Sequence, residues 1–137
     1  MQAPEYGGDG RKEADCARYT KPVATFPAHY APLELLFYTG TQFPEQYRNG
    51  VFVAFHGSWN RSPLPQGGYN VMFLPLNREA AAGSARVFAD GFAGTSAPSP
   101  GSAQHRPVGL AQAPDGGLYV SDDAGGRIWK ISYTGTP

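Results

Sequence analysis

The sequence predicts an all-β protein built as two four-stranded blades of a β-propeller. Apolar residues make up 41% of the 137 residues and aromatic residues 13%, which supplies the side chains for a hydrophobic core. The chain also has 18 Gly and 13 Pro, and these punctuate short runs of branched and aromatic residues, as turns separate strands. In addition, two stretches of the chain repeat the same order of strands and turns.

The individual strands are predicted from runs in which apolar residues alternate with polar ones, or form short blocks bounded by Gly and Pro. Only 11–19 and 77–82 have patterns that favour short helices, and the Ser-, Pro-, Gly- and Ala-rich residues 95–101 predict a linker. In chain order, the predicted strands are 22–26, 32–38, 51–56, 69–74, 85–89, 107–111, 117–121 and 127–133.

An internal repeat groups these strands into units. The segment beginning at Pro107 aligns with the one beginning at Pro32, so that Gly109 falls on Glu34 and Asp123 falls on His56; further along, Gly126 is aligned with Gly68. Such self-similarity is typical of architectures built from stacked repeats. The first unit, about 32–90, has four strands, and the second, about 106–133, has three.

The strand predicted at 22–26 has no partner in its own unit. We expect it to complete the second blade of a neighbouring copy, about 106–133, which lacks a fourth strand. The predicted organisation is therefore a polar amino-terminal segment, 1–21, followed by a two-blade unit, 22–137.

Two blades do not close a ring. Propellers close with about 4 to 8 blades, and open blades leave sheet edges and apolar faces in water. One head-to-tail interface repeated between identical copies closes a ring. The sequence therefore predicts either a piece of a larger protein or a chain that is its own partner in a ring, with four blades from two copies or six blades from a homotrimer.

Charge and composition exclude several classes of protein. The 11 Lys and Arg balance the 11 Asp and Glu without a basic stripe, which argues against nucleic acid as a partner. No run approaches the roughly 18 apolar residues of a membrane span. The single cysteine, Cys16, excludes an intrachain disulfide. The first eight residues, as given, show no basic region followed by an apolar run, so no signal peptide is predicted and the compartment stays open.

Several polar residues lie where the predicted strands meet the mouth of the propeller channel. Each also has a structural interpretation: a histidine as a loop hydrogen-bonder, an aspartate as a turn former, an arginine as an ion-pair partner between blades. A small-molecule substrate would bind at this mouth. The mouth candidates are His29, His56, His105, Arg106, Asp122 and Asp123.

Glu34 interrupts an apolar run, and its repeat partner is Gly109. A carboxylate in a narrow channel is costly unless it is paired or binds a metal. In a threefold ring, three copies would converge and hold a divalent cation, with calcium favoured by oxygen ligands. The predicted metal ligands are Glu34, Asp122 and Asp123. The alternative is that Glu34 pairs with Arg106 or Arg61 of an adjacent blade.

Several strings in the chain carry a family resemblance, and the longest is His56-Gly57-Ser58-Trp59-Asn60-Arg61. The others are Ala28-His29-Tyr30-Ala31-Pro32-Leu33, Phe37-Tyr38-Thr39-Gly40, Arg106-Pro107-Val108-Gly109-Leu110 and Leu118-Tyr119-Val120-Ser121-Asp122-Asp123. From Phe26 to Tyr133 the chain resembles the carboxy-terminal blades of sorbosone/glucose dehydrogenase-type proteins.

The resemblance implies a six-bladed propeller, and therefore a homotrimer of this chain. It also implies the use of pyrroloquinoline quinone (PQQ), in a family whose members are often exported. It implies that His56 takes the substrate proton and that Trp59, Arg61 and Arg106 contact the quinone. It also implies that the loop from Trp59 to Arg61 borders the cofactor and substrate pocket. Trp59 has a structural alternative, as a cap with its indole N–H bonded to a loop carbonyl.

Three functions follow from these residues. The first is a metal-dependent hydrolase of small esters, lactones or phosphoesters, in which channel metal activates a water. In it Glu34 binds the metal, His56 or His29 is the base, Arg106 and Asn60 hold the developing charge, and Trp59 forms an apolar wall. Its substrate-contacting residues are predicted as Trp59, Asn60, Arg61 and His105.

The second function is the family activity, PQQ-dependent oxidation of an aldose or sorbosone. The third is a propeller fragment without catalysis. Ser58 is not expected to be a nucleophile, since His-Gly-Ser is not the Gly-x-Ser-x-Gly elbow of serine hydrolases. Of the three, the metal argument at Glu34 puts the hydrolase first and the dehydrogenase second.

Overall fold

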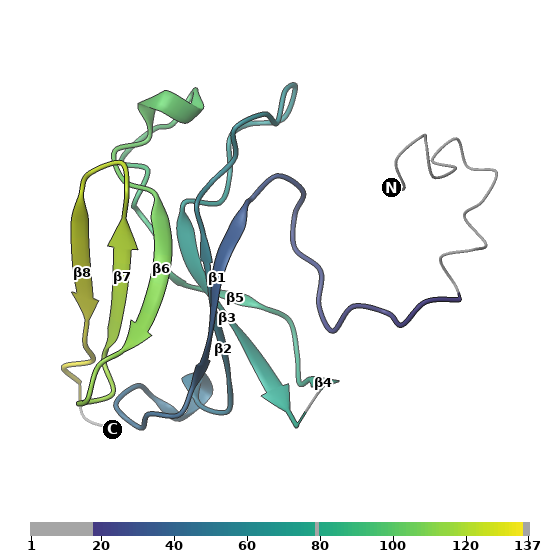
Figure 1. Ribbon diagram of the computed structural model, residues 1–137, viewed down its shortest axis with the longest axis vertical. Coiled ribbons are helices and arrows are strands. Elements are labelled where there is room, and N and C mark those ends of the chain that lie inside the picture. Colours follow the sequence, from purple (N-terminus) through teal and green to yellow (C-terminus); the bar gives the residue numbers. More distant parts are fainter. Residues whose placement is uncertain (1–17, 79, 136–137) are drawn as a thin grey trace.

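The computed structural model describes residues 18–78 and 80–135. They form two antiparallel sheets that lie side by side, the first blue to teal and the second green to yellow in Figure 1. Within these residues the helices are two short 3₁₀ segments, η2 (Glu45–Tyr47) and η3 (Pro100–Ser102). The predicted all-β class is therefore confirmed. None of the helices in the described part of the chain is long and apolar enough to cross a membrane.

The strands follow the predicted order along the chain. In the first sheet, β1, β2, β3 and β5 pair antiparallel, and the short β4 pairs with the end of β3; the second sheet has three strands. The bounds are β1 (Pro32–Tyr38), β2 (Gly50–Phe55), β3 (Asn70–Asn77), β4 (Ala80–Ala81), β5 (Arg86–Ala89), β6 (Pro107–Gln112), β7 (Leu118–Asp122) and β8 (Arg127–Ile131).

Two local predictions differ from the structure. The helix expected at 77–82 is wrong: β3 continues to Asn77 and turns back into β4, with Leu76 opposite Ala81. Arg78 has φ 57°, a left-handed conformation that ends the strand in a tight turn. Residues 22–26 form no strand in this chain, and Phe26 packs with its ring 4.9 Å from that of Phe55. Most of the helix expected at 11–19 lies outside the described residues, as does most of segment 1–21.

The register of the sheets supports the internal repeat. Pro32 begins β1 opposite Phe55, and Pro107 begins β6 opposite Asp122, so Asp122 is the repeat equivalent of Phe55. Both opening strands carry a register shift directly after the proline. Positions aligned at the ends of β2 and β7 are therefore equivalent in three dimensions.

The alignment of the third strands needs a correction of one residue. Val53 lies opposite Met72 and Val120 opposite Trp129, so Trp129 matches Met72 and not Val71. The physical reason is the turn before each strand. Two consecutive residues, Gly68 and Tyr69, have positive φ in the first sheet, whereas Gly126 alone enters β8 with positive φ.

A hydrophobic core fills the space between the two sheets. The first sheet contributes Phe52, Val71 and Phe73, and the second contributes Leu118 and Val120, all fully buried. Strand β6 lies against β1 and β2. This packing holds the end of β2 beside the end of β7, and the site lies there.

Candidate functional site

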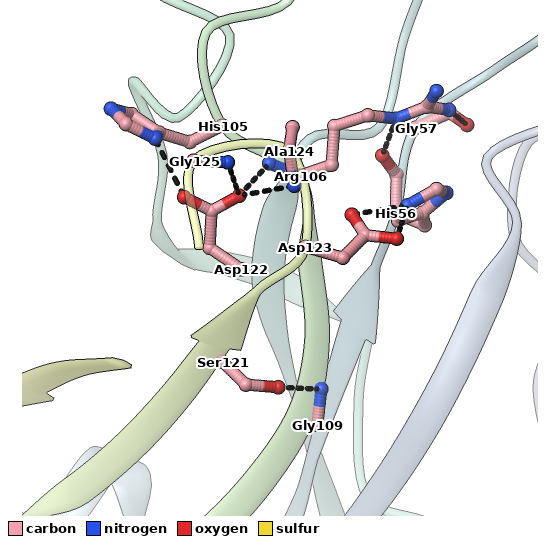
Figure 2. Close-up of polar contacts among 10 residues, drawn as sticks. All are labelled: His56, Gly57, His105, Arg106, Gly109, Ser121, Asp122, Asp123, Ala124 and Gly125. Atoms are coloured by element: carbon pink, nitrogen blue, oxygen red, sulfur yellow. Dashed lines mark hydrogen bonds and ion pairs between the residues drawn. The ribbon is translucent and has the colours of Figure 1, made fainter. Parts of the chain in front are cut away.

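His56 and Asp123 meet across the two sheets at the ends of equivalent strands. His56 follows β2 and Asp123 follows β7, and the imidazole Nε2 lies 2.9 Å from Asp123 Oδ1 and 3.2 Å from Oδ2, as Figure 2 shows. A carboxylate only accepts hydrogen bonds, so Nε2 carries the hydrogen and Nδ1 of the neutral ring is left as the acceptor. The pair is thus arranged as a histidine oriented by a carboxylate, the pattern of a general base.

Arg106 reaches from the second sheet to the backbone beside His56. Its Nε donates to the carbonyl of His56 at 3.1 Å and its Nη2 to the carbonyl of Gly57 at 2.9 Å. The guanidinium lies 5.8 Å from the centre of the Trp59 ring and 5.6 Å from that of Tyr69. Arg106 therefore joins the two sheets through carbonyl groups, in place of the ion pair considered from the sequence.

Asp122 caps the turn between β7 and β8 from inside the protein. Its Oδ1 accepts the backbone N–H of Arg106 at 2.8 Å and those of Ala124 and Gly125 at 3.1 Å each, while Oδ2 lies 2.6 Å from His105 Nδ1. Burial raises the pKa of Asp122, but these backbone N–H groups and the His105 ring outweigh it and hold the pKa below its ordinary value. The Asp122 carboxylate is therefore charged, and both of its oxygens have hydrogen-bond partners.

The loop after His56 is held in one shape by buried groups. Gly57 has φ 97°, and a Cβ there would lie 2.0 Å from the Tyr69 ring, so only glycine fits. Ser58 is fully buried; its hydroxyl donates to the Gln66 side chain and accepts the Gly67 N–H at 2.9 Å. Tyr69 donates its hydroxyl hydrogen to the Ser58 carbonyl at 2.7 Å. Ser58 is thus a structural residue, as expected for a serine outside a nucleophile elbow.

This loop presents three polar or aromatic side chains to solvent. Trp59 is 73% exposed, and Asn60 is exposed beside it. Arg61 lies over the Tyr30 ring at 5.2 Å and donates from Nη1 to the Pro65 carbonyl at 2.6 Å. A flat apolar surface and a cation therefore stand at the same end of the sheets as His56.

Two other predicted site residues, His29 and Glu34, lie apart from this cluster, whereas His105 joins it through Asp122. His29 is exposed in the turn before β1, with φ 65°. Glu34 is exposed on β1, where its Oε1 accepts the N–H of Leu35 at 3.2 Å, beside a shallow hollow of about 450 Å³ that Gly109 and Ser121 also line. His105 Nε2 lies 3.4 Å from Arg127, at the entrance of β8.

The three predicted metal ligands do not converge in one chain. Within the described residues, no group of three or more His, Cys, Asp or Glu side chains is placed to hold a metal ion. Asp122 is occupied by backbone N–H groups, and Asp123 by His56. A calcium site shared between copies through Glu34 stays a prediction.

Sequence reasoning missed two residues that shape the site. Tyr69 supports both Ser58 and Arg106, and Arg127 approaches His105. The signal that bears on Tyr69 is Gly57, because a glycine allows a close approach of the backbone, here to the Tyr69 ring. Nothing in the local sequence of Arg127 distinguishes it from an ordinary exposed strand residue.

Two other proteins are similar in sequence to this chain. An uncharacterized protein of Borreliella burgdorferi is 35% identical over 118 residues, which are 85% of this chain and 29% of that protein. A pyrroloquinoline quinone-dependent pyranose dehydrogenase of Coprinopsis cinerea is 32% identical over 165 residues, covering 98% of this chain and 21% of the dehydrogenase. The chain therefore spans less than a third of the length of the relatives it matches.

A solved structure shows the same fold. The calcium structure of the Trichoderma reesei Carbohydrate-Active Enzymes Family AA12 protein superposes with a TM-score of 0.72 at 22% identity. The match covers 91% of this chain and 30% of that one. The arrangement of the two sheets is thus a substructure of a larger β protein.

The comparisons correct the function that the sequence put first. The metal-dependent hydrolase is wrong, because the named relative is a quinone-dependent dehydrogenase. The predicted resemblance to PQQ-dependent sugar dehydrogenases is confirmed. A family model described as TrAA12-like matches residues 2–134. The chain belongs to the TrAA12-like family.

Proposed function

We propose that this chain forms part of a PQQ-dependent sugar dehydrogenase, in which His56 takes the proton from the sugar hydroxyl. The observation that carries the proposal is the His56–Asp123 pair, with Nε2 bound to the carboxylate at 2.9 Å and Nδ1 left as the acceptor. A general base of this kind contributes about 10²- to 10⁴-fold to a rate. Membership of the TrAA12-like family and the similarity to a pyranose dehydrogenase support the reaction class.

The residues around His56 fit a flat, tricarboxylated quinone. Arg106 commits only Nε and Nη2 to carbonyl groups, which leaves Nη1 for a carboxylate. Arg61 adds a second guanidinium, and Trp59 offers an exposed ring face. Arginine is suited to carboxylates because its planar fork matches their geometry. Arg61, Arg106 and Trp59 would therefore hold PQQ in this chain.

The positions of these residues suggest the role of each one in the reaction. PQQ, when bound, supplies the acceptor for the two electrons that leave the sugar carbon. His56 removes the hydroxyl proton at Nδ1, and Asp123 stabilises the imidazolium that results. The loop fixed by Ser58 and Tyr69 holds Trp59 in place, so that its exposed ring face is available to the flat quinone.

Quinone titration tests the proposal. Purified chain is titrated with PQQ by calorimetry, and pyranose-dependent dye reduction is then followed with the loaded protein. We expect saturable binding, and we expect Arg61→Gln to weaken it by about tenfold to a hundredfold, since a hydrogen bond to a charged group contributes about 1.5–3 kcal/mol. The matched control is Arg86→Gln on β5, whose guanidinium lies over the Tyr47 ring. Absence of PQQ binding, or equal loss in both variants, contradicts the proposal.

We also propose that three copies of this chain close a six-bladed propeller. Val120 lies in the core between the sheets, whereas its equivalent, Val53, lies on the opposite face of the first sheet. That face is only partly covered. Phe26 packs against it, whereas Leu35 is 50% and Phe37 66% exposed beside an apolar hollow of about 440 Å³. The exposed part of this face, around Leu35 and Phe37, is where another second sheet would fit.

Native mass spectrometry tests ring closure. We expect a trimer, and we expect Phe37→Asp to give monomers because it places a charge in the apolar interface. Leu64→Asp is the control, since Leu64 is 60% exposed on the loop after His56 and not on this face of the first sheet. A monomeric parent chain, or a trimeric Phe37→Asp variant, contradicts the ring.

A further inference from the structure

Asp122 is a buried charge at a position where the fold accommodates an apolar side chain. Its repeat equivalent is Phe55, which is fully buried in an apolar cluster of the first sheet. The Asp122 side chain is likewise fully buried. Burying a carboxylate costs several kcal/mol unless hydrogen bonds and partners compensate. The blade architecture thus does not require a charge here, and the reason for it lies in what Asp122 binds.

The Asp122 carboxylate holds both elements of the second sheet that contact His56. Through Oδ1 it binds the backbone N–H of Arg106, whose side chain donates to the His56 carbonyl. The same oxygen binds the N–H groups of Ala124 and Gly125, which fixes the turn that carries Asp123 (Figure 2). One buried group therefore sets the positions of two residues that meet His56.

Asp123 depends on this support because its own side chain is 60% exposed. An exposed carboxylate on a turn keeps one orientation only when the backbone beneath it is fixed. Gly125 allows that backbone to close tightly, since a Cβ there would lie 2.5 Å from His105 Nδ1 and 2.6 Å from Asp122 Oδ2. His105 binds the remaining oxygen of Asp122 and completes its coordination.

We propose that Asp122 is a positioning residue for the proton acceptor: it fixes Arg106 and the Asp123 turn so that His56 presents Nδ1. The inference rests on the proposed function only where it takes Nδ1 of His56 to be the atom that accepts the proton of the sugar hydroxyl. Asp122 itself does not contact the substrate, and it acts through Asp123. His105 supports it by binding Oδ2.

The test reads the His56 tautomer by ¹⁵N NMR of the imidazole, on the full chain without quinone. We expect the parent protein to show the Nε2–H form alone in the neutral ring. Asp122→Ala should give a mixture of both tautomers, and so should Asp123→Asn. In the double variant the tautomer mixture should match that of Asp123→Asn alone, because Asp122 acts through Asp123.

Asp115→Asn is the matched control. Asp115 precedes β7 and caps a turn through the Gly117 N–H at 3.0 Å, so it is the same residue type in a turn at the other end of one strand. It differs from Asp122 in being exposed and paired with Lys130. We expect this variant to keep the parent spectrum of His56. A mixture of tautomers in Asp115→Asn would overturn the inference, because the effect would then follow from any loosened turn in the sheet.

A second variant, Asp122→Phe, tests the inference if Asp122→Ala does not fold. Asp122→Phe restores the side chain that the first sheet has at the equivalent position, and it should fold while losing the single His56 tautomer. A folded variant of either kind that keeps the parent tautomer overturns the proposal, whatever its melting temperature. If neither variant folds, Asp122 is needed for the fold itself, and the proposal also fails. Lack of PQQ binding in the parent chain contradicts the proposed function alone, since the NMR result is read without quinone.

Discussion

His56→Ala is expected to lower the turnover of the quinone-loaded protein by about two to four orders of magnitude, the usual contribution of a general base. The variant removes Nδ1, the atom left free by the bond between Nε2 and Asp123. Quinone affinity should stay within a few-fold of the parent, because Arg61 and Arg106 remain. The measurement is kcat for dye reduction with a pyranose, beside a calorimetric titration of PQQ.

The control for His56 is Gln46→Ala in η2. Gln46 is exposed in the segment that precedes the first residue of β2, whereas His56 follows its last residue. This variant should keep the parent kcat. Full activity in His56→Ala would contradict the role of the imidazole as the proton acceptor, and loss of quinone binding in the same variant would make His56 a cofactor ligand instead.

Phe52→Ala is expected to have the largest effect on stability, with a loss of about 3–5 kcal/mol in the free energy of unfolding. Phe52 is fully buried at the centre of the core between the sheets, and truncation leaves a cavity there. Urea denaturation followed by tryptophan fluorescence measures the change. The rings around Phe52 have centroids at 5.3 Å (Tyr38), 5.9 Å (Phe43), 5.0 Å (Phe73) and 4.6 Å (Phe88).

Leu64→Ala serves as the comparison for Phe52. Leu64 is 60% exposed, so its truncation should change stability by less than about 0.5 kcal/mol. A midpoint for Phe52→Ala equal to that of Leu64→Ala would mean that the two sheets do not form one cooperative unit. If Phe52→Ala does not fold at all, its loss in the free energy of unfolding has reached the upper limit of the expected range.

The fold was predictable because its signals are local. Each of the strands β1, β2, β3, β5, β6, β7 and β8 is a run of branched or aromatic residues between turn residues, which an alternating pattern reveals. The helix predicted at 77–82 was wrong because the structure there does not depend on a local pattern. A two-residue strand such as β4 exists only through its pairing with β3. Residues 22–26 have a strand composition, but the partner that would make them a strand is not part of the two sheets.

The sequence predicted where the candidate site residues lie, but not the contacts that each of them makes. The repeat placed His56 and Asp123 at equivalent strand ends, and the fold brings them into contact. Asp122 and Asp123 are alike in sequence, yet Asp122 is buried and capped whereas Asp123 is exposed, because neighbouring residues point to opposite sides of the chain. Glu34 lies on β1 beside the hollow that its repeat partner Gly109 also lines, and its convergence with other copies in a ring stays a prediction.

The contact between His56 and Asp123 has a consequence for how such a site can arise. The equivalent ends of β2 and β7 lie beside each other, so two sheets with the same residue at this position would set two histidines or two aspartates there, and neither makes this pair. The contact therefore requires the two repeats to differ at this one position.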